Sequence, residues 1–173
     1  MAMHPDRLLP ADPGVRDIAR TLYAEVKDLP IISPHGHVPA QWLADDTAFA
    51  DPTNLLITPD HYVTRILHAQ GLSLDELGVG RKLSSPESRA AFRILCNHWP
   101  AFRGTAVQYW LEGQLADVFG LDVQPGPDTT DASYAAIDAA LQTPPILPRA
   151  LHDRFRIEFL ATPDDPADDL RYH

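Results

Sequence analysis

The chain of 173 residues has a single cysteine, Cys96, and therefore no internal disulfide. A lone thiol fits a protein of a reducing compartment. The sequence also lacks any run of about 18 apolar residues, so no segment is predicted to span a membrane. Its first residues have no apolar stretch typical of a signal peptide. We therefore expect a cytoplasmic protein without a membrane partner.

Basic residues are scarce. The chain has 14 Lys+Arg against 24 Asp+Glu, and its formal net charge is −10. This balance argues against nucleic acid as the main partner. Glycine-rich phosphate-binding motifs such as Gly-x-Gly-x-x-Gly are also missing, which argues against a nucleotide-binding loop.

The composition that remains is that of a globular protein, with 45% hydrophobic and 22% charged residues. Its length predicts one domain or a little more. The 17 prolines are about twice the average share. Many short elements with sharp ends are therefore expected.

One short apolar segment ends in His35-Gly36-His37, and we predict a strand over residues 30–35. Residues i and i+2 of a strand share one face, so His35 and His37 would project together and could share a divalent ion. Two imidazoles do not complete a zinc site. The alternative is a pair of surface or capping histidines beside a turn glycine.

Helices are predicted wherever a cap residue, a proline and apolar residues at helical spacing follow one another. Asp12-Pro13 and Thr58-Pro59-Asp60 are such starts, and residues 45–56 are expected to be irregular. Strand character returns only near the end of the chain. The predicted helices cover 13–27, a short turn from 39, 58–71, 85–98, 105–119, 132–141 and 148–154, and the second strand covers 156–161.

The order of elements divides the chain into three parts. Residues 1–38 hold a helix and the first strand, 39–154 form a helical excursion, and 155–173 hold the second strand and a loop. The excursion is far longer than an ordinary crossover. Two parallel strands alone do not make a stable sheet, so the remainder of the sheet is expected outside this sequence.

A second pair of polar residues, His61 and Tyr62, falls in the first turn of a predicted helix. Partial positive charge at that end favours anions, and an imidazole beside a phenol can move protons at a carbonyl. The alternative is an ordinary polar first turn with Tyr62 partly packed. Asp164 and Asp165 follow the second strand, and Asp165 is interpreted as a helix cap.

The other candidate residues have plainer interpretations. Cys96 has no paired base and is not predicted to be a nucleophile. We expect surface or structural roles for the remaining histidines and core positions for the tryptophans. These residues are His68, His98, His152, His173, Trp42, Trp99 and Trp110.

Four motifs, in this order, resemble the uronate (glucuronate) isomerase family of the amidohydrolase superfamily. They are Leu29-Pro-Ile-Ile-Ser-Pro-His35-Gly-His37, Asp60-His61-Tyr62-Val-Thr-Arg65, Trp110-Leu-Glu-Gly-Gln-Leu-Ala-Asp-Val-Phe119-Gly120 and Thr162-Pro-Asp164-Asp165-Pro166-Ala-Asp168-Asp169-Leu170-Arg-Tyr-His173. Ser33 departs from the family pattern, which usually has an aspartate there.

The resemblance implies an α/β fold, the N-terminal part of a metal-dependent (β/α)8 TIM barrel with a large helical insertion between strands 1 and 2. It implies a divalent metal, expected to be zinc, on His35 and His37, with a further aspartate ligand beyond this sequence. His61 and Tyr62 would be catalytic, and Arg65 is a weak candidate for binding the substrate carboxylate.

The implied reaction is the aldose–ketose isomerisation of hexuronates, D-glucuronate to D-fructuronate and D-galacturonate to D-tagaturonate. The present chain, as an N-terminal fragment, is expected to be inactive alone. Two alternatives remain, namely another metal hydrolase of the superfamily and a non-catalytic truncated helical module. The sequence is compatible with a homo-oligomer as well as with a monomer.

Overall fold

The computed structural model describes residues 4–165 and 167–173. The described chain divides into two compact units. One, the helical unit, is Ala48–Ile146, and it lies within the predicted insertion 39–154. The other, the strand unit, combines residues 4–47 with Leu147–His173. An α/β chain is the result, with its two strands far apart in sequence.

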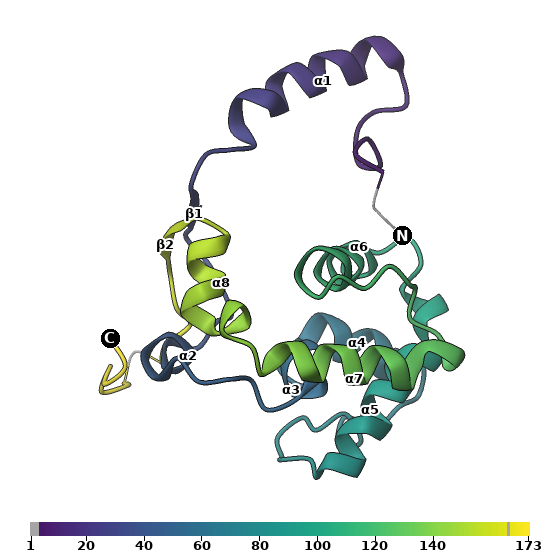
Figure 1. The fold of residues 1–173 in the computed structure, drawn as a ribbon, viewed down its shortest axis with the longest axis vertical. Coiled ribbons are helices and arrows are strands. Elements are labelled where there is room, and N and C mark those ends of the chain that lie inside the picture. The colour runs from purple at the N-terminus through teal and green to yellow at the C-terminus, as the bar shows by residue number, and fades with distance from the viewer. Residues whose placement is uncertain (1–3, 166) are drawn as a thin grey trace. The chain divides into compact units, whose positions relative to one another are not determined.

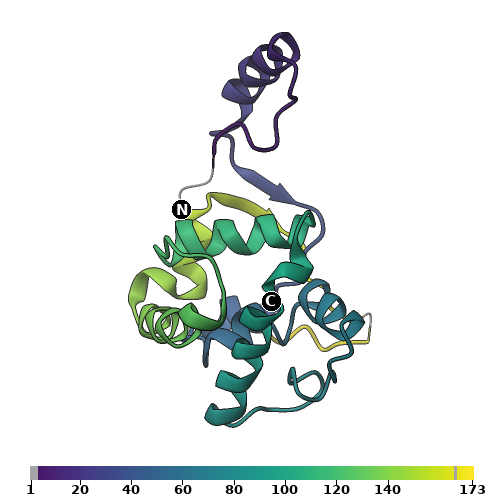
Figure 2. The same cartoon turned by 90° about the vertical axis from the view of Figure 1, so that its right-hand side faces the viewer.

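The strand unit contains two short parallel strands, β1 (Ile31–Ser33) and β2 (Ile157–Leu160). Ile31 pairs with Ile157 and Ser33 with Leu160, and the strands run side by side in both views (Figures 1 and 2). The Ala161 N–H donates to the Ser33 carbonyl at 2.9 Å and extends the pairing by one residue. Parallel pairing of the two predicted strands is confirmed.

Helix α1 (Pro13–Val26) confirms the predicted helix 13–27 and begins as its cap signal indicates. The Asp12 carboxylate accepts from the Val15 N–H at 2.9 Å, and Pro13 is the first helical residue. None of the residues of α1 is buried. Its large apolar side chains are all at least half exposed, namely Val15, Ile18, Leu22, Tyr23 and Val26. The amphipathic pattern therefore leaves an uncovered apolar face.

Helices α2 (Ala40–Asp45) and α8 (Pro148–Arg154) belong to the strand unit and come, along the chain, just before and just after the helical unit. Arg149 joins them. Its Nε donates to the Leu43 carbonyl at 2.7 Å and its Nη2 to the Ala44 carbonyl at 2.9 Å. Its backbone N–H donates to Asp46 Oδ1 at 2.9 Å. Two of the last carbonyls of α2 are thus satisfied from a residue about a hundred positions away.

The helical unit is built from several short helices (Figure 1), and most of the buried apolar residues of the described chain belong to it. Phe92, Phe102, Leu67 and Ile137 are among its fully buried side chains. The helices are α3 (Pro52–Leu56), α4 (His61–Ala69), α5 (Ser85–Asn97), α6 (Ala106–Gly113) and α7 (Thr130–Leu141), with short helical turns η1 (Trp99–Phe102), η2 (Gln114–Val118), η3 (Pro127–Thr129) and η4 (Pro144–Ile146).

Helix α3 corrects the prediction that residues 45–56 are irregular. Asp51-Pro52 is the same start signal as Asp12-Pro13, and the Asp51 carboxylate accepts from the Asn54 N–H at 2.9 Å. The helix is held on α5 because the buried Thr53 hydroxyl donates to the Ser88 carbonyl at 2.6 Å. A helix of this length forms because tertiary contacts hold it, and such contacts leave little trace in sequence periodicity.

Two further details differ from the sequence prediction. Helix α4 is capped by Asp60, whose carboxylate accepts from the Tyr62 N–H at 2.8 Å, and Thr58 is not the cap. The Thr58 hydroxyl instead donates to the Leu77 carbonyl at 2.8 Å. The predicted helix 105–119 is α6 followed by the π-helical turn η2. Gly120 ends it with φ of 67°, a conformation that favours glycine.

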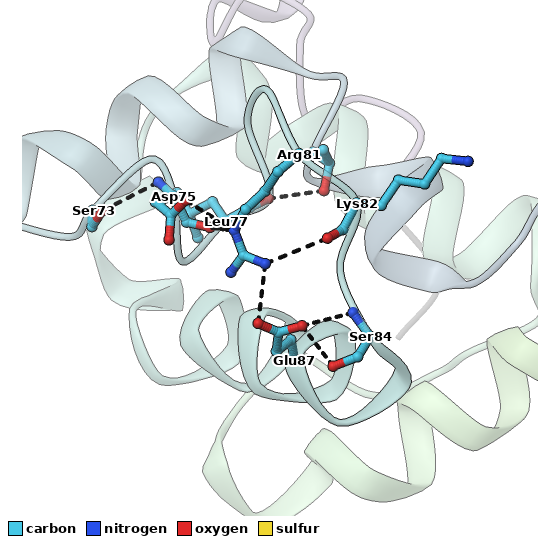
Figure 3. Close-up of polar contacts among 8 residues, drawn as sticks. Ser73, Asp75, Leu77, Arg81, Lys82, Ser84 and Glu87 are labelled. Atoms are coloured by element: carbon cyan, nitrogen blue, oxygen red, sulfur yellow. Dashed lines mark hydrogen bonds and ion pairs between the residues drawn. The ribbon is translucent and has the colours of Figure 1, made fainter.

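A network of polar side chains holds the start of α5 (Figure 3). Glu87 Oε2 accepts from the Ser84 N–H at 2.7 Å and from the Ser84 hydroxyl at 2.6 Å. Arg81 bridges Glu87 at 3.0 Å and Asp75 at 2.9 Å. The hydrogen bonds from Ser84, with that from Arg81, lower the pKa of Glu87 from its ordinary 4.5 to about 2.

Among the helices of the described residues, none combines the length and the apolar character that spanning a membrane would require.

Candidate active-site residues

The two histidines of the first motif lie just beyond β1, which ends at Ser33. The prediction of a strand through His35 is therefore wrong. Ser33 turns the chain, because its hydroxyl donates to the His35 carbonyl at 2.9 Å, and Pro34 has no N–H to continue the pairing. The predicted closeness of the imidazoles is confirmed nevertheless. His35 Nε2 and His37 Nε2 are 3.1 Å apart, and the rings meet edge to face with centroids 5.1 Å apart.

This spacing fits two ligands of one metal ion. Two imidazole nitrogens bound to a tetrahedral zinc lie about 3.3 Å apart, given bond lengths of about 2.0–2.1 Å. Both side chains belong to exposed residues, so an ion can reach them. Within the described part of the chain, no other His, Cys, Asp or Glu joins the pair as a third ligand. The pair can therefore contribute half of a four-coordinate site.

Gly36 separates the two histidines and packs closely against the end of β2. A Cβ at this position would lie 3.2 Å from the Ala161 carbonyl oxygen and 3.3 Å from Leu160 Cδ1. Ala161 is itself fixed by its hydrogen bond to Ser33. The glycine thus allows the histidine turn to rest on β2, and β2 in turn helps to fix where the imidazoles point.

His61 and Tyr62 lie in the first turn of α4, as the sequence predicted, and are its first two residues. Their rings lie 4.2 Å apart between centroids and are tilted by 35°. Tyr62 is 37% exposed, so part of the residue is accessible to solvent. The Asp60 cap fixes the backbone of this turn, and both side chains start from a rigid helix end.

Arg65 and Trp110 are the neighbours of Tyr62. Arg65 Cζ lies 5.3 Å from the centroid of the phenol ring, within the range of a cation–π contact. Trp110, from α6, meets the same ring edge to face at 5.8 Å. The prediction that Trp110 belongs to the core is wrong, since 46% of the residue is exposed. Trp99, in contrast, is buried and stacked on Phe102.

A third polar cluster follows β2. His173 Nε2 lies 2.9 Å from Asp164 Oδ2, and the Thr162 hydroxyl also donates to Asp164. The Thr162 hydrogen bond, with the one from His173, lowers the pKa of Asp164 below its ordinary value. His173 therefore has a partner that sequence spacing did not reveal. Asp165 accepts from the Ala167 N–H at 2.8 Å and caps a turn, since no helix begins there within the described residues.

The remaining candidates keep structural roles. His68 and His98 each place Nδ1 near a carbonyl of their own segment, at 2.8 Å from Leu72 and 2.9 Å from Ile94. Cys96 is buried, and burial raises the pKa of its thiol, which disfavours the reactive thiolate.

A cavity of about 360 Å³ in the helical unit lies apart from all these candidates and is lined by Asp51, Arg89, Tyr134 and Asp138 among others. Two of its charged groups already have partners, since Arg89 stacks on Tyr134 at 4.3 Å and Asp51 caps α3.

Comparison with known proteins supports the resemblance seen in the sequence. A sequence model of the glucuronate isomerase family matches residues 14–173. A uronate isomerase of Cutibacterium acnes is 55% identical over 100% of this chain and 37% of its own length. One of Phenylobacterium zucineum is 50% identical over 100% of this chain and 36% of its own length.

Solved structures agree. A crystal structure of glucuronate isomerase from Caulobacter crescentus superposes with a TM-score of 0.92 at 44% identity, over 99% of this chain and 36% of that one. Uronate isomerase from Thermotoga maritima gives 0.83 at 26% identity. The chain thus spans little more than a third of the length of these relatives. With a match that runs almost from end to end, the chain belongs to the glucuronate isomerase family.

Proposed function

We propose that this chain is the N-terminal portion of a uronate isomerase built on a (β/α)8 barrel, with the helical unit inserted between the first two barrel strands. The observation that carries the proposal is the His35–His37 pair, 3.1 Å apart at the carboxyl end of β1, in a chain of this family. The carboxyl ends of barrel strands are where such enzymes hold their reactive groups.

The proposed reaction interconverts an aldose and a ketose uronate. A proton leaves C2 while the C1 carbonyl oxygen is protonated, and an enediol results. The enediol then receives a proton at C1 as its C2 hydroxyl loses one, so no oxidant or reductant is consumed. D-glucuronate would give D-fructuronate, and D-galacturonate would give D-tagaturonate.

His35 and His37 would hold a divalent ion, with zinc the expected metal. When bound, the ion supplies positive charge that stabilises negative charge developing on the sugar oxygens. The two imidazoles fit this role because their nitrogens converge at a ligand-to-ligand distance. Gly36 keeps them in place by allowing the turn to rest against β2.

His61 and Tyr62 would act at the carbonyl end of the sugar, in ring opening or proton transfer. Both groups exchange protons, both are exposed, and both are anchored at one capped helix end. Arg65 lies over the Tyr62 ring and is the candidate for the uronate carboxylate.

The test uses the complete enzyme that contains this chain. Incubation with D-glucuronate or D-galacturonate should produce the corresponding ketose, which can be followed by chromatography or by a coupled reductase. Hydrolysis of an amide or lactone without ketose formation would support a superfamily hydrolase instead. Absence of both activities in the metal-loaded enzyme would point to a non-catalytic protein.

Two sets of variants separate the roles. His35→Ala and His37→Ala, each as a single variant, should lower the zinc content measured by elemental analysis. Each should also abolish turnover. His61→Asn or Tyr62→Phe should lower kcat by about 10²-fold at unchanged metal content, because one proton-transfer group is lost. His98→Asn, in the same helical unit but bonded to its own helix, is the matched control and should be active. Near-normal turnover of both His61 and Tyr62 variants would refute their catalytic role.

A further inference from the structure

Trp110 is the large aromatic residue whose position the core of the helical unit does not explain. Its neighbours on α6, Val107 and Leu111, are buried, whereas Trp110 is 46% exposed. An indole half exposed to water gives up much of the free energy that its burial would provide. The contact that the structure does give it is with Tyr62, at 5.8 Å and an interplanar angle of 76°.

The contact with Trp110 restricts the orientation of the Tyr62 ring. Tyr62 lies in the first turn of α4 and is itself 37% exposed, and the χ2 torsion of a tyrosine is broad. His61 and Arg65, which also approach the ring, belong to the same helix and are exposed. Trp110 comes from a second helix, so it ties the ring to another part of the same unit.

We propose that Trp110 is a positioning residue, which holds the Tyr62 ring so that its hydroxyl is aimed at the carbonyl end of the substrate. The inference rests on the proposed isomerase function and on the role of Tyr62 in it. An edge-to-face pair adds modestly to stability, but a catalytic group displaced by about 1 Å can cost up to about 10²-fold in rate. The effect should therefore appear in kcat far more than in the stability of the fold.

The experiment compares Trp110→Ala with Trp110→Phe in the complete, metal-loaded enzyme. Trp110→Ala should lower kcat by roughly 10-fold and leave KM within about twofold. The reason is that the substitution would disturb the orientation of the Tyr62 hydroxyl without removing a contact that binds the substrate. Trp110→Phe keeps an aromatic edge and should recover most of kcat. Val123→Ala truncates an apolar residue of similar exposure, 49%, in the same unit and should be silent. An unchanged kcat in Trp110→Ala, or a loss confined to KM, overturns the inference.

A double-mutant cycle tests whether Trp110 acts through the hydroxyl. In a Tyr62→Phe background the hydroxyl is absent, so Trp110→Ala should reduce kcat by less than about twofold more. A full additional loss of about 10-fold would show that Trp110 acts independently of Tyr62 and would refute the proposal.

A readout that needs no turnover keeps the inference separate from the proposed function. With fluorotyrosine incorporated, the ¹⁹F resonance missing from Tyr62→Phe belongs to Tyr62. It should shift and narrow in Trp110→Ala but not in Val123→Ala. An unshifted resonance refutes the contact even if the enzyme is an isomerase. Absence of ketose formation in wild-type enzyme, with the resonance shifted as expected, would instead refute the isomerase function and with it any catalytic purpose of the contact.

Discussion

Removing the Arg149 side chain should loosen the strand unit. In Arg149→Ala, the carbonyls of Leu43 and Ala44 lose the two guanidinium hydrogen bonds of 2.7 and 2.9 Å. The backbone bond to Asp46 stays, because it needs no side chain at position 149. What is lost is thus confined to two charge-assisted bonds at the end of α2.

The magnitude follows from the exposure of this site. A hydrogen bond to a charged group contributes about 1.5–3 kcal/mol when protected from water, and exposure of Arg149 reduces that by competition with solvent. We expect the two bonds together to contribute about 1.5 kcal/mol to the free energy of unfolding. For a chain of this size such a loss corresponds to roughly 3–6 °C in Tm.

The assay is thermal unfolding followed by circular dichroism, on the chain itself and on three variants. Arg149→Lys should lie between wild type and Arg149→Ala, since an ammonium cannot fork to two carbonyls. Asp46→Asn is the matched control: asparagine keeps the acceptor and tolerates the φ of 47° found there, so its Tm should stay within about 1 °C. Arg149→Ala within 1 °C of wild type would refute the reasoning.

The remaining predictions concern the histidine turn, the α5 network and α1. Gly36→Ala should weaken zinc binding by the complete enzyme roughly 10-fold in a chelator competition, because the added Cβ would press on the Ala161 carbonyl. Gly14→Ala, whose Cβ would make only an ordinary contact, is the control and should bind zinc normally. Equal zinc affinities of the two variants would contradict this prediction. Glu87 has a lowered pKa in the folded state, so its contribution to stability is complete above about pH 4.5 and is lost as the pH falls towards about 2. Over that pH window, Tm should therefore drop less steeply in Glu87→Gln than in the wild-type chain. Parallel plots of Tm against pH for the two proteins would contradict this prediction. The isolated chain should self-associate through the exposed apolar face of α1. Ile18→Glu should therefore lower the average mass of the particles seen in analytical ultracentrifugation. A monomer for both the wild-type chain and the variant would refute association through α1.

Local signals in the sequence account for most of the helices. Asp12-Pro13 and Gly71 act within a few residues of themselves, so the start of α1 and the end of α4 follow from capping alone. Residues 45–56 show where this fails. The cap Asp51-Pro52 was present, but five residues are too few for periodicity, and α3 exists because the Thr53 hydroxyl bonds α5.

The sequence by itself therefore determined the family, the helical excursion, and the two pairs His35–His37 and His61–Tyr62. Short spacing between chemically specific residues is enough for that. The tertiary structure alone decided that Trp110 lies against Tyr62, that Asp164 pairs with His173, and that Arg149 closes the end of α2. These contacts join residues that are distant in the chain or separated by irregular loops. No periodicity connects such residues, since only packing of the whole unit brings them within hydrogen-bonding or van der Waals distance.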